Sequence, residues 1–73
     1  MKLDIEFEQE TDGRWIAEVP ALPGVLVYGD DQADAQHKVV ALALRVLADR
    51  IDHGEAVPVD LAELFEMHGG AAA

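Results

Sequence analysis

The first residues of the chain alternate between apolar and acidic side chains. From Lys2 to Glu10, one face of an extended segment would carry Leu3, Ile5 and Phe7, and the other would carry Asp4, Glu6 and Glu8. This alternation is typical of a β-strand with one face on a core and the other in water. The segment is therefore predicted to be the first strand of a sheet.

A second alternating run, Arg14 to Val19, follows the turn signal Thr11-Asp12-Gly13. Two such runs joined by a short loop predict an antiparallel hairpin. Within the second run, Trp15 shares a face with Ala17 and Val19. Trp15 can belong to the core, as a large aromatic residue commonly does, or it can anchor a partner.

A third strand is predicted from Val25 to Tyr28, after a turn at Pro23-Gly24. Proline and glycine are the residues that the two central positions of a type II turn require. The strand is apolar on both sides, so its periodicity does not decide which face is buried. Leu26 and Tyr28 can complete the core or face a partner.

A helix is predicted from Gln32 to Asp52. Gly29 ends the third strand, Asp31 is placed to cap the helix, and Asp34 is placed to reach back in the manner of a capping box. Gly54 provides the glycine that commonly follows a helix. Lys38 lies four residues after Asp34, a spacing that favours an ion pair.

Two apolar stripes run along this helix. One stripe consists of Val40, Leu44, Leu47 and Ile51, and the other of Ala35, Val39, Leu42 and Val46. One sheet covers both stripes poorly, so we expect one stripe on the sheet and the other, at least in part, on another protomer. The residues assigned to this oligomer interface are Val39, Leu42 and Val46.

The remainder of the chain predicts two short elements. Val57-Pro58-Val59 suits a closing edge strand, because its proline cannot donate to a β-ladder. Asp60 to His68 has the pattern of a short helix that docks through Leu64 and Phe65, and residues 69–73 are expected to be a frayed tail. The predicted fold is α+β: a three-stranded antiparallel sheet, one long helix on it, a closing strand and a short C-terminal helix.

The composition of the chain limits the classes of function that it can have. The chain has 73 residues, no cysteine and a formal net charge of −10. A chain this small has a marginal core, and oligomerisation is one remedy. The acidic charge opposes DNA or RNA binding; it fits either a well-solvated surface or a surface complementary to a basic partner. No segment resembles a signal peptide or a membrane span, and the lack of cysteine fits a cytoplasmic location.

The sequence does not predict an enzyme. It contains no serine or cysteine nucleophile, and its carboxylates are spread along a strand face and a helix face rather than gathered at one point. His37 and His53 lie on nearly opposite sides of the predicted helix, so one chain cannot bring them to one metal ion. We expect no catalytic residues, no metal and no cofactor.

Two runs of residues resemble the HicB family of antitoxins. Residues 15–24, Trp-Ile-Ala-Glu-Val-Pro-Ala-Leu-Pro-Gly, are similar to the family's aromatic-x-Ala-x-Val-Pro-x-Leu-Pro-Gly, and residues 29–35, Gly-Asp-Asp-Gln-Ala-Asp-Ala, are similar to its Gly-Asp-Thr-x-x-Glu-Ala. Asp31 stands where the family usually has threonine or serine, and Asp34 where it has glutamate. The resemblance covers about residues 1–59, which would form a HicB-like βββαβ domain, leaving residues 60–73 as a short helix and tail.

The resemblance implies a partial ribonuclease-H-like core that neutralises a small basic ribonuclease of the HicA type by obstructing its active histidine. Many family members also carry a DNA-binding domain, for which the residues after Val59 are too few. The residues expected to contact the toxin are Glu6, Trp15, Glu18, Leu26, Tyr28 and Asp30, and the structural turn and cap are Pro23, Gly24, Gly29 and Asp31. The alternative is an orphan domain that associates with itself and has no toxin partner.

Overall fold

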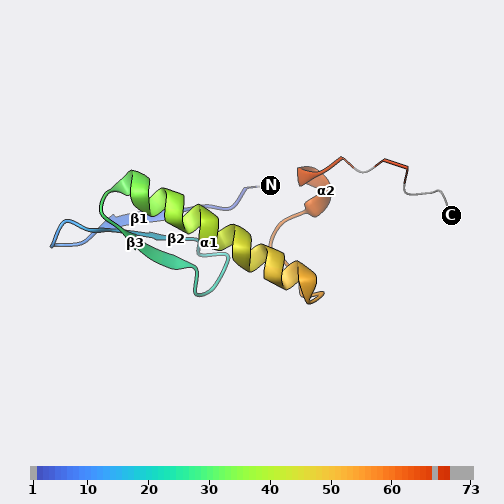
Figure 1. Cartoon of the computed structure of the whole chain (residues 1–73), viewed down its shortest axis with the longest axis horizontal. Coiled ribbons are helices and arrows are strands. Elements are labelled where there is room, and N and C mark those ends of the chain that lie inside the picture. Colours follow the sequence, from blue (N-terminus) through green and yellow to red (C-terminus); the bar gives the residue numbers. More distant parts are fainter. Residues whose placement is uncertain (1, 67, 70–73) are drawn as a thin grey trace.

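The protein forms a three-stranded antiparallel sheet with one long helix across one of its faces (Figure 1). The computed structural model describes residues 2–66 and 68–69, with only the backbone described at Ala62. The strands are β1 (Glu6–Gln9), β2 (Trp15–Glu18) and β3 (Leu26–Gly29), in the order β1-β2-β3. The helices are α1 (Gln32–Asp52) and α2 (Leu61–Leu64). The predicted α+β sheet and long helix are confirmed.

The register of the sheet decides which side chains face α1. Phe7, Ala17 and Val27 lie opposite one another on the three strands, and Ala17 is fully buried under the helix. Successive residues of a strand point to opposite faces, so the neighbouring rows belong to the far side of the sheet. Trp15, half-buried, is on the α1 side and packs against the core.

Two consecutive turns join β2 to β3. The Leu22 amide donates to the Val19 carbonyl at 2.9 Å, and the Val25 amide donates to the Leu22 carbonyl at 3.0 Å. Gly24 has a φ of +87°, as the third position of a type II turn requires, so the Pro23-Gly24 prediction is confirmed. The turns insert Leu22 into the core, where only 1% of its surface is exposed.

Both ends of α1 are capped at the residues that the sequence predicts, but the Asp34 carboxylate bonds the amide of Asp30 and not that of the N-cap residue Asp31, as a capping box would require. The Asp31 carboxylate accepts the Asp34 amide at 2.7 Å, and the Asp34 carboxylate in turn accepts the Asp30 amide at 3.0 Å. At the other end Gly54 has a φ of +69°. The Gly54 amide donates to Ile51 and the Glu55 amide to Arg50, which is the Schellman arrangement.

The core shows which helix stripe faces the sheet. Its buried apolar residues are Ala17, Val19, Leu22, Val25, Ala35, Val39, Ala43 and Leu47. Val39 has no exposed surface, so its assignment to an oligomer interface is wrong: the sheet of its own chain covers it. Leu42 and Val46 are half-buried at the margin of the same core, and their predicted role remains untested.

The chain after α1 differs from the prediction. Val57-Pro58-Val59 forms no strand; Val57 and Val59 pack against the core through their side chains. Pro58 has no amide hydrogen to offer a neighbouring strand, and the two valines pack there without strand pairing. The helix predicted over Asp60 to His68 is a single turn, α2, and Leu64 and Phe65 are 58% and 62% exposed rather than docked. Of the predicted tail, residues 70–73 lie outside the described residues.

Candidate protein-binding face

The sheet face that points away from α1 gathers acidic and apolar side chains. Two rows of the register form it, Glu6 beside Glu18 and Leu26, and Glu8 beside Ile16 and Tyr28. We call these six residues the open sheet face. Leu26 and Tyr28 are 43% and 45% exposed, and Ile16 is half-buried between them and the glutamates of β1.

A broad, shallow hollow of about 440 Å³ lies on the β1–β2 half of this face. It is lined by Glu6, Phe7, Glu8, Ile16 and Glu18. On this face the lining therefore combines three glutamates with Ile16, because the Phe7 side chain belongs to the row on the α1 side of the sheet. Such a surface can accept an apolar side chain surrounded by cationic groups.

Two of the three glutamates on this face lie directly opposite each other. Glu6 and Glu18 are direct cross-strand partners in the antiparallel pair, and like charges in that position are destabilising. Among the described residues, no ion pair or hydrogen bond engages the carboxylates of Glu6, Glu8 or Glu18. A cationic partner would therefore relieve a repulsion that the free chain retains.

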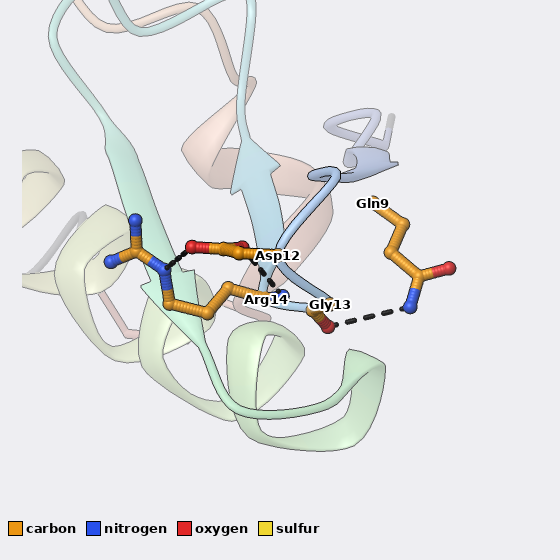
Figure 2. Close-up of polar contacts among 4 residues, drawn as sticks. All are labelled: Gln9, Asp12, Gly13 and Arg14. Carbon is orange, nitrogen blue, oxygen red and sulfur yellow. Dashed lines mark hydrogen bonds and ion pairs between the residues drawn. The ribbon is translucent and has the colours of Figure 1, made fainter.

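Arg14 holds the Tyr28 end of the open sheet face. Its guanidinium carbon lies 4.7 Å from the centroid of the Tyr28 ring, within cation–π range. Asp12 fixes Arg14 from the β1–β2 turn: Asp12 Oδ2 accepts from Arg14 Nε at 2.9 Å, and Asp12 Oδ1 accepts from the Arg14 amide at 3.0 Å (Figure 2). Donation from the Arg14 amide, followed by donation from its side chain, lowers the pKa of Asp12. The Tyr28 ring is thus held beside an ordered turn.

Four of the six residues predicted to bind a partner lie together on this face: Glu6, Glu18, Leu26 and Tyr28. Trp15 is on the opposite side of the sheet, which favours its alternative role in the core. Asp30 lies beyond β3, and its amide is engaged by Asp34 at the start of α1.

The prediction missed Glu8 and Ile16. Both could have been found from the alternation of their strands, because Ile16 has the same parity as Glu18 and Glu8 the same parity as Glu6. The sequence alone did not show that β2 lies between the other two strands, which is what places Ile16 at the centre.

In the described part of the chain, no group of three or more histidine, cysteine, aspartate or glutamate residues is arranged to hold a metal ion. No helix within residues 2–66 and 68–69 is long and apolar enough to cross a membrane.

The chain is thus a small α+β domain that exposes acidic and apolar side chains on one face of its sheet. The chain is similar to a UPF0150 protein of Thermoplasma acidophilum, with 28% identity over 68 residues that cover 93% of this chain and 99% of that protein. A scan against descriptions of known protein families gives no match. A search of solved structures likewise gives none.

Proposed function

We propose that this chain is a non-enzymatic, HicB-like antitoxin domain that neutralises a small basic ribonuclease of the HicA type. The observation that carries the proposal is the open sheet face, where Glu6, Glu8 and Glu18 lie around Ile16 without a cationic partner among the described residues. A basic nuclease offers the opposite charge. Its RNA-binding surface must be cationic, because it has to attract phosphate groups.

The apolar residues of the face supply the contact area. Ile16, Leu26 and Tyr28 form an apolar patch beside the glutamates, and exposed aromatic and aliphatic anchors of this kind provide most of the affinity of protein interfaces. The glutamates mainly accelerate encounter and set orientation. Binding at this face would cover the nuclease surface that RNA needs, so inhibition requires no chemistry by the antitoxin.

Two further features support the proposal. The residues that carry the HicB resemblance form a type II turn and a helix cap, the local structures that their sequence requires. A three-stranded antiparallel sheet followed by a helix is also the beginning of the partial ribonuclease-H-like arrangement that the resemblance implies. A cytoplasmic location, where such a toxin acts, is part of the proposal.

Co-purification tests this function. The small protein encoded next to this chain is expressed with it, and an affinity tag on this chain should retain a basic ribonuclease in a stoichiometric complex. Replacing Leu26 with Asp, on the open sheet face, should abolish retention, whereas Asp52→Asn, on the exposed side of α1, should not. A neighbouring protein that is neither small nor basic, or one that binds both variants equally, would contradict the proposal.

A second candidate is an orphan domain that associates only with itself. Self-association, which this candidate requires, has a surface available in the exposed apolar residues Val40, Leu44 and Ile51 of α1. The two candidates differ in their partner: the orphan domain would form a homo-oligomer and retain no nuclease in the same experiment.

A further inference from the structure

One side of α1 carries an exposed apolar strip that the sheet does not cover. Val40, Leu44 and Ile51 are 40%, 61% and 45% exposed. At about 100° per residue they fall within an arc of about 40°. All the charged residues of α1 lie outside that arc; they are Asp34, Lys38, Arg45, Asp49, Arg50 and Asp52.

An apolar hollow of about 170 Å³ adjoins this strip. It is lined by Leu3 and Ile5 from the segment before β1, by Val19 just after β2, and by four residues of α1: Val40, Ala43, Leu44 and Leu47. Every lining residue is aliphatic. A cavity of about 150 Å³ with such a lining takes up a benzene-sized apolar group, so one leucine side chain matches the hollow in size and chemistry.

We propose that the strip and the hollow bind a second copy of this chain, with the two α1 helices antiparallel. Leu44 of each copy enters the apolar hollow of the other. A two-fold contact of this kind uses the same patch on both subunits, and Leu44 both projects from the strip and borders the hollow. The contact lies on the helix side of the sheet, so the open sheet face stays accessible in both copies.

Three features of the molecule select a second copy as the occupant. The strip from Val40 to Ile51 extends over about 17 Å at 1.5 Å per residue, a length that another α1 matches. It is free of charged residues, so two chains of net charge −10 can meet there without bringing carboxylates into contact. The core of each chain is also small, with three alanines among its eight buried apolar residues in the described part, and additional burial is what such a core lacks.

The rival occupant is the α2 segment of the same chain. It exposes Leu64 and Phe65, which could fold back onto the hollow. However, α2 has a single turn, from Leu61 to Leu64, and spans less than half the strip. The segment also brings the acidic residues Asp60, Glu63 and Glu66 to a hollow that has no cationic lining.

Sedimentation equilibrium tests the dimer on the full-length chain. The wild type should sediment at twice its chain mass of 7.9 kDa at micromolar concentration. Leu44→Asp should raise the dimer dissociation constant by about 30-fold or more, the effect of losing a central anchor, with an unchanged circular dichroism spectrum because Leu44 is exposed. Leu26→Asp on the open sheet face and Phe65→Asp after α2 are the controls and should remain dimeric. A wild type that is monomeric at millimolar concentration overturns the proposal, as does a dimer that Phe65→Asp dissociates and Leu44→Asp does not.

Disulfide trapping tests the antiparallel geometry independently. The chain has no cysteine, so a single introduced thiol reports one position. In the proposed dimer Leu44→Cys places two thiols near the two-fold axis, and a mild oxidant should convert the variant to a covalent dimer within minutes. The control Leu26→Cys should remain monomeric in denaturing electrophoresis. Equal cross-linking of the two variants would show only random collision and would overturn the geometry.

Discussion

Gly29 is a point of close approach between the sheet and the helix. A Cβ atom built on it would lie 2.7 Å from Ala35 Cα and 2.9 Å from Ala35 Cβ, closer than real atoms pack. Ala35 belongs to the first turn of α1 and is itself fully buried, so it cannot move aside cheaply. The absence of a side chain at Gly29 therefore sets the spacing between β3 and α1.

Gly29→Ala should lower the free energy of unfolding by about 1–3 kcal/mol, the usual cost of overpacking. Urea denaturation monitored by circular dichroism measures the change. The adjacent variant Asp30→Ala, at an exposed site, is the control and should change the free energy by less than about 0.5 kcal/mol. Unchanged stability of Gly29→Ala would contradict the close approach.

Asp34 links the stability of the start of α1 to pH. Donation from the Asp30 amide, and then the Lys38 ammonium at 3.0 Å, lower the pKa of Asp34 from its ordinary value of 3.8. Because the folded pKa is depressed, the stabilisation is present above 3.8 and is lost as the pH falls through the lowered value. Asp34→Asn should therefore flatten the acid limb of the curve of unfolding free energy against pH. If Asp34→Asn and Asp52→Asn give acid limbs of the same shape, the assignment is wrong.

At the scale of elements, the sequence predicted the two ends of α1 more accurately than the side of α1 that packs on the sheet. The cap at Asp31 and the glycine at Gly54 fix the ends of α1, and both depend on residues adjacent in sequence. Which stripe meets the sheet depends on how α1 lies over the strands, and periodicity along one helix does not contain that information. The two apolar stripes were equivalent in sequence, so Val39 was assigned to the wrong neighbour.

The same distinction between local and tertiary information explains what could be predicted of the open sheet face and of residues 57–59. The alternation of the strands correctly placed Glu6 and Glu18 on the face away from the core. That these two glutamates lie directly opposite each other follows from the β1–β2 register. The sequence predicted a closing edge strand at Val57-Pro58-Val59, and it could not show that Val57 and Val59 reach the core without a strand. Pairing between distant segments is a tertiary property.

The opposition of Glu6 and Glu18 leads to a prediction on stability. Glu6→Lys replaces a like-charge pair by an opposite-charge pair and should raise the free energy of unfolding by about 0.2–1 kcal/mol at low salt. Glu55→Lys, an exposed substitution with the same change of net charge, controls for the general repulsion within the chain. The advantage of Glu6→Lys over this control should disappear at about 1 M salt, where the Debye length is only about 3 Å and charge–charge interactions are strongly screened. Equal effects of the two variants would contradict the cross-strand repulsion.

At the scale of the whole molecule, the two candidate surfaces lie on different sides of the sheet. The open sheet face is acidic with an apolar centre, and the α1 strip is apolar and uncharged. A dimer through α1 would therefore present two acidic faces outwards. Each face could engage its own basic nuclease without disturbing the contact between the copies.

The net charge of −10 predicts how association with that nuclease depends on salt. The association rate constant should fall steeply as ionic strength rises, because the attraction is long-ranged, while the dissociation rate constant should change little. Stopped-flow fluorescence can follow both, with a fluorophore attached to the nuclease. An association rate that is independent of salt would exclude electrostatic steering by this chain.

The most direct test of the central claim is a titration of ribonuclease activity. RNA cleavage by the basic nuclease is measured against increasing amounts of this chain and of the triple variant Glu6→Gln, Glu8→Gln and Glu18→Gln. A second triple variant, Asp49→Asn, Asp52→Asn and Glu55→Gln, alters the net charge equally but lies at the exposed end of α1 and just beyond it. The wild type and the second variant should inhibit stoichiometrically, and the open-sheet-face variant should need at least tenfold more protein. Equal inhibition by the two variants, or none by the wild type, would contradict the assignment of the open sheet face as the toxin-binding surface.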